Sequence, residues 1–121
     1  MVLQESGEMY LETLLILSQK SRYVRAIDIG EEMGFSRPSV SRAMHLLKDG
    51  GFLSIDPDGA ITLTETGREV AEKIYERHTV LTDWLTSLGV DSGVAANDAC
   101  KIEHCISDES FDAIKRHIGA K

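Results

Sequence analysis

The segment of residues 24–49 most constrains what this chain can fold into, because it encodes two short amphipathic helices joined by a turn. Apolar residues at helical spacing predict the first helix over residues 24–33, and Gly34 is a residue type that often ends helices. Ser36 can cap the second helix, which the apolar spacing extends to Asp49. Two short helices joined by a glycine-containing turn are typical of a helix-turn-helix.

A β-hairpin is predicted directly after these two helices. The runs 52–55 and 60–63 are β-prone and flank Asp56-Pro-Asp-Gly59, a sequence that favours a tight turn. An amphipathic helix is predicted over residues 8–18, with Ser6 as its N-cap. A helix, a helix-turn-helix and a hairpin in this order predict a winged-helix DNA-binding domain, a far more specific pattern than a helix-turn-helix alone.

The second helix of the helix-turn-helix is expected to present its first turns to the major groove of double-stranded DNA or to its phosphates. The net charge of −7 argues against indiscriminate nucleic-acid binding, but residues 20–48 carry six Lys or Arg against three Asp or Glu. This basic window indicates one local anionic partner, although ordinary surface charge is the alternative for each arginine. The predicted DNA-binding residues are Ser36, Arg37, Pro38, Ser39, Ser41 and Arg42.

The rest of the chain is predicted to be helical, over residues 65–88, 92–105 and 108–117. This half carries more apolar surface than a small wing can cover, so dimerisation is the expected way to bury it. A dimer also matches a two-fold DNA site. The expected fold is mainly α, with a winged helix-turn-helix DNA-binding domain at residues 1–72 followed by an all-helical dimerisation domain at residues 73–121.

Three residues of metal-ligating types lie close together in the C-terminal half, and we call Cys100, Glu103 and His104 the Cys-Glu-His cluster. On a helix these positions are i, i+3 and i+4, so a thiolate, a carboxylate and an imidazole project from one face. Three such groups rarely complete the coordination of a first-row metal. Further ligands from elsewhere in the chain or from water are therefore expected.

Both cysteines, Cys100 and Cys105, are expected to be thiols, because the N-terminus lacks the charged and apolar regions of a secretory signal. No apolar run reaches the length of about eighteen residues that a membrane-spanning helix needs, and the expected location is the cytoplasm. A redox switch that uses the two thiols is the main alternative to a metal site. Five positions apart on a helix, however, they would lie on different faces.

Several short motifs follow one another along the chain. They are Glu8-Met-Tyr-Leu11, Ser36-Arg-Pro-Ser-Val-Ser41, Tyr75-Glu-Arg-His78, and Ala99-Cys-Lys-Ile-Glu-His104 followed by Ser107-Asp-Glu109. No one of them would suffice alone. Together, in this order and at these separations, they resemble the diphtheria-toxin-repressor (DtxR) family of metal-dependent regulators, including its manganese-responsive MntR branch. The likeness covers nearly the whole chain.

The resemblance implies one metal site formed by Met9, Cys100, Glu103 and His104, which is a mixed set of soft and hard ligands. In the manganese branch the positions of Met9 and Cys100 are carboxylates, so here the chain follows the iron-responsive branch. Fe²⁺ is therefore favoured over Mn²⁺ as the signal. Co²⁺, Ni²⁺ or Zn²⁺ could substitute in vitro, because affinities in such sites follow the Irving–Williams order.

The resemblance leaves a second metal site open. His78 matches a histidine of the family's ancillary site, and Glu12 matches a ligand position of the manganese branch. A hybrid site of Glu12 and His78 that shares Glu103 is one reading. Thr82 and Ala96 stand where iron-type members have a carboxylate and a histidine, which argues against a complete iron-type site.

The expected function is that of a homodimeric, divalent-metal-activated repressor of metal homeostasis genes that binds double-stranded operator DNA, with no membrane association and no small organic substrate. Iron-type members usually continue into a proline-rich linker and an SH3-like domain, whereas this chain ends at Lys121 like the short MntR branch. An enzyme such as a small metal-dependent hydrolase is disfavoured, because the sequence predicts neither a pocket-forming sheet nor a spare general base.

Overall fold

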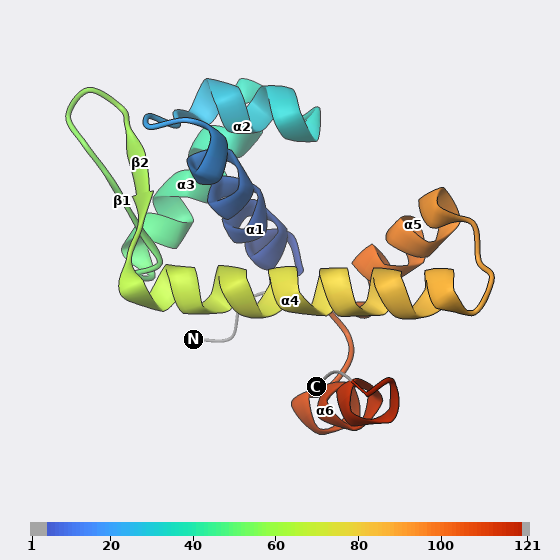
Figure 1. Ribbon diagram of the computed structural model, residues 1–121. Coiled ribbons are helices and arrows are strands. Elements are labelled where there is room, and N and C mark those ends of the chain that lie inside the picture. Colours follow the sequence, from blue (N-terminus) through green and yellow to red (C-terminus); the bar gives the residue numbers. More distant parts are fainter. Residues whose placement is uncertain (1–4, 120–121) are drawn as a thin grey trace. The chain divides into compact units, whose positions relative to one another are not determined.

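The computed structural model describes residues 5–119, and their elements follow the order that the sequence predicts (Figure 1). The elements are α1 (Glu5–Lys20), α2 (Ala26–Met33), α3 (Arg37–Asp49), β1 (Leu53–Ile55), β2 (Ile61–Leu63), α4 (Glu65–Ser87), α5 (Ser92–Ile102) and α6 (Asp108–His117). The mainly helical fold with a helix-turn-helix, a wing and a helical C-terminal half is thus confirmed. Within the described residues, no helix combines the length and apolar character needed to cross a membrane.

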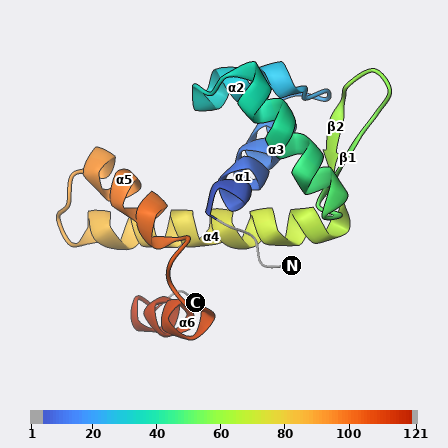
Figure 2. The ribbon, with the colours of Figure 1, turned by 180° about the vertical axis from the view of Figure 1, so that it is seen from behind.

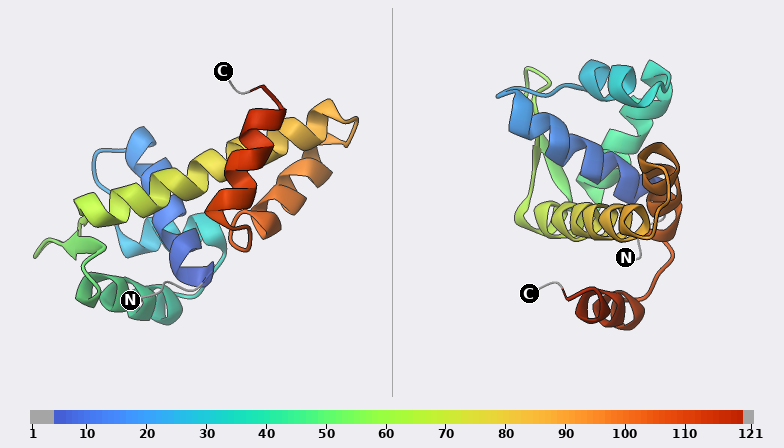
Figure 3. Two further views of the ribbon diagram at one scale, coloured as in Figure 1. Left: turned by 90° about the horizontal axis from the view of Figure 1, so that it is seen from below. Right: turned by 45° about the vertical axis from the view of Figure 1, so that its right-hand side comes forward.

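The chain divides into two compact units, and the boundary falls between Glu72 and Lys73 within α4. The N-terminal unit holds the first three helices, the hairpin and the start of α4. In it, α3 runs from the turn after α2 to the base of the hairpin (Figure 2). The C-terminal unit holds the rest of α4 with α5 and α6, and α5 returns along α4 (Figure 3).

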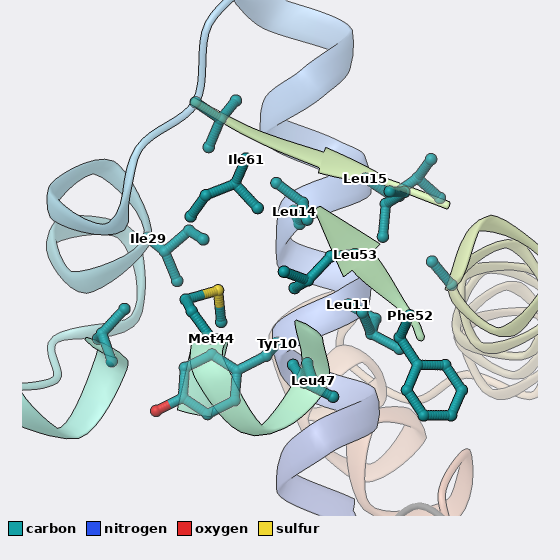
Figure 4. Packing of buried hydrophobic residues seen from close by; sticks show 14 residues of the cluster. Tyr10, Leu11, Leu14, Leu15, Ile29, Met44, Leu47, Phe52, Leu53 and Ile61 are labelled. Carbon is teal, nitrogen blue, oxygen red and sulfur yellow. The ribbon is translucent and has the colours of Figure 1, made fainter. Parts of the chain in front are cut away.

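One apolar core joins the helices of the N-terminal unit to its hairpin (Figure 4). Leu11 and Leu14 of α1, Ile29 of α2, Met44 of α3 and Leu53 of β1 are all buried in it. The positions on each helix lie on one face, so the opposite face of α3 stays at the surface. The core therefore fixes α3 against α1 and leaves the first turns of α3 available for a partner.

The start of α2 differs from the prediction because of a contact between residues that are far apart in the sequence. The helix begins at Ala26, two residues later than predicted, because its N-cap Arg25 is extended and the chain just before it is held to the wing at Val24. The carbonyl of Val24 accepts a hydrogen bond from the backbone N–H of Ile61 at 2.8 Å, which ties the approach to α2 to strand β2. At the end of α2, Gly34 takes a φ of 74°, a left-handed conformation that favours glycine.

The start of α4 is fastened to the end of the helix-turn-helix by Thr64. Its hydroxyl donates to the carbonyl of Gly51 at 2.7 Å and accepts from the N–H of Gly67 at 3.1 Å. Gly67 itself lies against the backbone of Phe52, where an added Cβ would come within 1.8 Å of the carbonyl oxygen. The position therefore requires glycine for packing, because any side chain would collide with backbone atoms.

The predicted caps have mixed outcomes. Ser36 caps α3 by accepting from the N–H of Ser39, and Ser107 caps α6 in the same way through Ser110. The expectation that Ser6 caps α1 was wrong, because the helix is already formed at Glu5.

Candidate metal centre

The structure brings the three residues of the Cys-Glu-His cluster together at the end of α5. Their ligand atoms all lie within 4.8 Å of one another. Cys100 is in the last turn of α5, whereas Glu103 is its C-cap and His104 lies in the turn that follows. The helix thus ends at Ile102, three residues earlier than predicted, and the chain tightens there through a hydrogen bond from Cys105 N–H to the Ile102 carbonyl at 2.9 Å.

The burial of this cluster fits a cation. The side chain of Glu103 is fully buried, while Cys100 and His104 are half-buried. A buried carboxylate is costly unless it is hydrogen-bonded, paired with a charge or bound to a metal. A thiolate, a carboxylate and an imidazole together suit first-row divalent ions such as Fe²⁺, Co²⁺ or Zn²⁺. The donor set and its burial therefore fit the metal that the motifs imply.

His78 of α4 contacts this cluster directly. Its Nδ1 lies 2.8 Å from Oε1 of Glu103, a distance at which an N–H on Nδ1 donates to the carboxylate. His78 is partly exposed, whereas Glu103 is not. The structure thus joins His78 to Glu103, two of the three residues predicted to share a second site.

Met9 and Glu12 lie on α1, and both are half-buried. They belong to the N-terminal unit, whereas the Cys-Glu-His cluster and His78 belong to the C-terminal unit. The roles of Met9 in the primary site and of Glu12 in a second site stay predictions. Thr82 and Ala96, on α4 and α5, are half-buried.

Arg77 is a residue whose role the sequence did not reveal. It is only 6% exposed, and its Nη1 donates to the carbonyls of Glu103 at 3.0 Å and Ile106 at 2.7 Å. Its Nη2 pairs with the carboxylate of Asp108 at the start of α6. A signal was present, because Arg77 stands three residues after buried Ile74, on the apolar face of α4.

The carboxylate of Asp108, at the surface, pairs with Lys73 as well as with Arg77. Lys73 approaches its carboxylate at 2.8 Å. The hydrogen bond from Lys73, with a further contribution from Arg77, holds the pKa of the Asp108 carboxyl below its usual range. The carboxyl therefore stays ionised across physiological pH, and it remains an acceptor for both cations.

The predicted DNA-binding surface lies on the exposed side of α3. Its buried side carries Val40, Met44 and Leu47, which pack into the core. The hydroxyl of Ser36 is engaged in capping, since it also donates to the hydroxyl of Ser39 at 2.9 Å. All six predicted contact residues are exposed, namely Ser36, Arg37, Pro38, Ser39, Ser41 and Arg42.

A winged helix-turn-helix followed by a helical unit with a Cys-Glu-His cluster defines a class of DNA-binding regulators with a metal centre. Residues 2–61 match the family described as iron dependent repressor, N-terminal DNA binding domain. Residues 64–120 match the iron dependent repressor, metal binding and dimerisation domain. The chain therefore belongs to the iron-dependent repressor family, and it is a metal-dependent transcriptional repressor of the DtxR and MntR type.

Named relatives agree with this membership. An uncharacterised helix-turn-helix transcriptional regulator of Methanocaldococcus jannaschii is 31% identical over 115 residues, which cover 93% of this chain and 92% of that protein. The transcriptional regulator MntR of Escherichia coli O157:H7 is 30% identical over 106 residues, covering 88% of this chain and 68% of that protein. Both are described as transcriptional regulators and neither as an enzyme.

Solved structures support the fold. A manganese-dependent transcriptional repressor in complex with manganese has a TM-score of 0.84 at 26% identity, covering 95% of this chain and 53% of that one. The manganese regulator SloR has a TM-score of 0.85 at 23% identity, covering 100% of this chain and 56% of that one. The chain spans about half the length of these two structures.

Proposed function

We propose that this protein is activated by a divalent metal, with Fe²⁺ favoured over Mn²⁺, and represses metal homeostasis genes as a homodimer on operator DNA in the cytoplasm. The observation that carries the proposal is the Cys-Glu-His cluster, whose ligand atoms lie within 4.8 Å of one another around a buried carboxylate. Family membership supports the DNA-binding and dimerisation roles.

The ligand types support the choice of Fe²⁺. Cys100 supplies a thiolate and Met9 would supply a thioether, and such soft ligands suit Mn²⁺ less well than carboxylates, carbonyls and water do. Two similar solved structures are described as manganese-dependent or manganese regulators, which makes Mn²⁺ the second candidate. Loss of a sulfur ligand should therefore weaken the binding of Fe²⁺ more than the binding of Mn²⁺. Substitution of Met9 or Cys100 can thus distinguish the two ions.

The proposed switch depends on α1. Met9 would hold the metal from α1, while Cys100, Glu103 and His104 hold it from α5 and the turn that follows. When bound, the ion supplies a bond between segments that are far apart in the sequence. Because Leu11 and Leu14 pack α1 into the same core as α3, restraint of α1 also restrains the recognition helix.

A DNA-binding titration with each metal in turn, under anaerobic conditions and with a metal count per subunit, tests the proposal. We expect Fe²⁺ to raise operator affinity, and operator DNA to raise Fe²⁺ affinity by the same factor, typically about 5–150-fold. Equal operator affinity with chelator and with every metal would contradict it. Binding that follows oxidant and not metal would instead establish the redox alternative, in which exposed Cys105 acts with Cys100.

Replacement of Arg42 by Ala is expected to weaken operator binding by about tenfold or more, because one phosphate or base contact is lost. Metal affinity measured without DNA should stay unchanged, since Arg42 is exposed on α3. Arg68→Ala is the matched control, because this exposed arginine pairs with Glu72 on α4. Equal operator affinity for Arg42→Ala and wild type, in fluorescence anisotropy titrations at fixed salt, would remove Arg42 from the interface.

A further inference from the structure

Two neighbouring residues of α4 bind Glu103, one at its main chain and the other at its side chain. Arg77 binds its backbone carbonyl at 3.0 Å, and His78 lies 2.8 Å from its carboxylate. Glu103 is therefore fixed in main chain and side chain by α4.

The three residues of the Cys-Glu-His cluster differ in what holds their backbone. Cys100 lies within α5, where the hydrogen bonds of the helix fix its position. Glu103 and His104 lie at and beyond the helix end, where carbonyl groups no longer have partners within the helix. The N–H of Glu103 still donates to the Ala99 carbonyl at 2.8 Å, so it is the carbonyl side of this turn that contacts from another element hold.

Arg77 provides those contacts through a single buried guanidinium. It donates to the carbonyls of Glu103 and Ile106, pairs with Asp108, and lies over the ring of Phe111 with its Cζ 5.6 Å from the centroid. The backbone from the end of α5 to the first turn of α6 is thus folded around one cation. A positive charge beside the C-terminal carbonyls of a helix also suits the helix dipole.

We infer that Arg77 is the positioning residue of the metal centre: it holds the turn that carries Glu103 and His104, so that both converge with Cys100 before metal binds. The inference rests on the proposed function, since it assigns Arg77 a role at that same site. A guanidinium is needed, because Nη1 donates to two carbonyls while Nη2 pairs with a carboxylate, so two nitrogens in a fixed geometry are used at once. A lysine, with one ammonium on a flexible stem, cannot replace it.

Lysine substitution is therefore the informative change, and Lys115 offers a matched control. Arg77→Lys keeps the charge and most of the buried aliphatic stem, which favours folding. Lys115 lies over the same Phe111 ring at 5.7 Å and pairs with Glu76 at 2.8 Å. Lys115→Gln thus removes a cation from that ring and an ion pair from α4 without touching the hydrogen bonds of Arg77.

The test is an anaerobic Co²⁺ titration of the full chain without DNA, read by the thiolate-to-cobalt absorption and accompanied by urea unfolding of the metal-free protein. Arg77→Lys should bind Co²⁺ about 10–100-fold more weakly than wild type, with an altered cobalt spectrum, as is typical when a partner of metal ligands is lost. Lys115→Gln should retain the affinity and the spectrum of wild type.

Wild-type affinity and spectrum in Arg77→Lys would overturn the inference, as would an equal loss of affinity in Lys115→Gln. If Arg77→Lys does not fold, Asp108→Asn carries the test, since exposed Asp108 is a partner of Arg77 and its loss should weaken Co²⁺ binding in the same direction. Unchanged binding in Asp108→Asn would then count against Arg77. Absence of the thiolate-to-cobalt band in wild type would refute the proposed metal site itself, which is a separate outcome.

Discussion

Replacement of Cys100 by Ser, or of His104 by Ala, should abolish the metal dependence of operator binding and leave the fold intact. Each change removes one of three clustered ligand atoms, and a serine hydroxyl is not a ligand of comparable strength at neutral pH. Loss of a direct ligand should cost more than the about 10–100-fold typical of outer partners. Both side chains are only half-buried, so their truncation leaves the apolar cores untouched.

The measurement compares operator affinity at saturating Fe²⁺ and with excess chelator for each variant, with circular dichroism as the check on folding. Cys105→Ser is the matched control, because this exposed thiol lies in the same turn but outside the cluster. Cys105→Ser should respond to metal as wild type does. A full metal response in both Cys100→Ser and His104→Ala would refute the site.

Replacement of Gly67 by Ala should destabilise the N-terminal unit by about 3 kcal/mol or more, the upper end of the range for overpacked cores. The added Cβ would lie 1.8 Å from the carbonyl oxygen of Phe52 and 2.8 Å from its carbonyl carbon. Both are backbone atoms, so no rotation of a side chain relieves the collision. The start of α4 would have to move away from the hairpin, which also breaks the hydrogen bonds of Thr64 to Gly51 and Gly67.

Urea unfolding monitored by circular dichroism tests this effect, with Gly93→Ala as the control. Gly93 is also near the start of a helix, but its added Cβ would meet only the carboxylate of Asp91, the end of a flexible side chain, at 3.3 Å. Alanine there should change stability by no more than about 1 kcal/mol, the range for glycine and alanine within helices. A Gly67→Ala variant as stable as wild type would show that α4 does not pack as described.

Local signals predicted much of the fold, because caps and turns depend on neighbouring residues. Ser36 and Ser107 cap helices at the expected places, and Asp56-Pro-Asp-Gly59 forms the turn of the wing. The beginning of α2 was wrong because Val24 pairs with Ile61, a contact between residues far apart in the sequence. The predicted end of α5 was wrong because the spacing of apolar residues does not show where a residue of another element, here Arg77, hydrogen-bonds the carbonyls that follow the helix.

The candidate site follows the same rule. Cys100, Glu103 and His104 could be grouped by spacing alone, since they lie within one helical turn of one another. The contacts of Arg77 and His78 with Glu103 could not be predicted from spacing, because α4 and the end of α5 are adjacent only after folding. The predicted role of Met9 as a metal ligand rests on the family resemblance alone, because no spacing pattern relates Met9 to residues so far along the chain.

The most direct test of the account is a crystal structure of the metal-loaded protein bound to its operator. The account predicts one divalent ion bonded to the sulfur of Met9 and to the ligand atoms of Cys100, Glu103 and His104. An ion held by the Cys-Glu-His cluster while the Met9 sulfur lies outside bonding distance would contradict it.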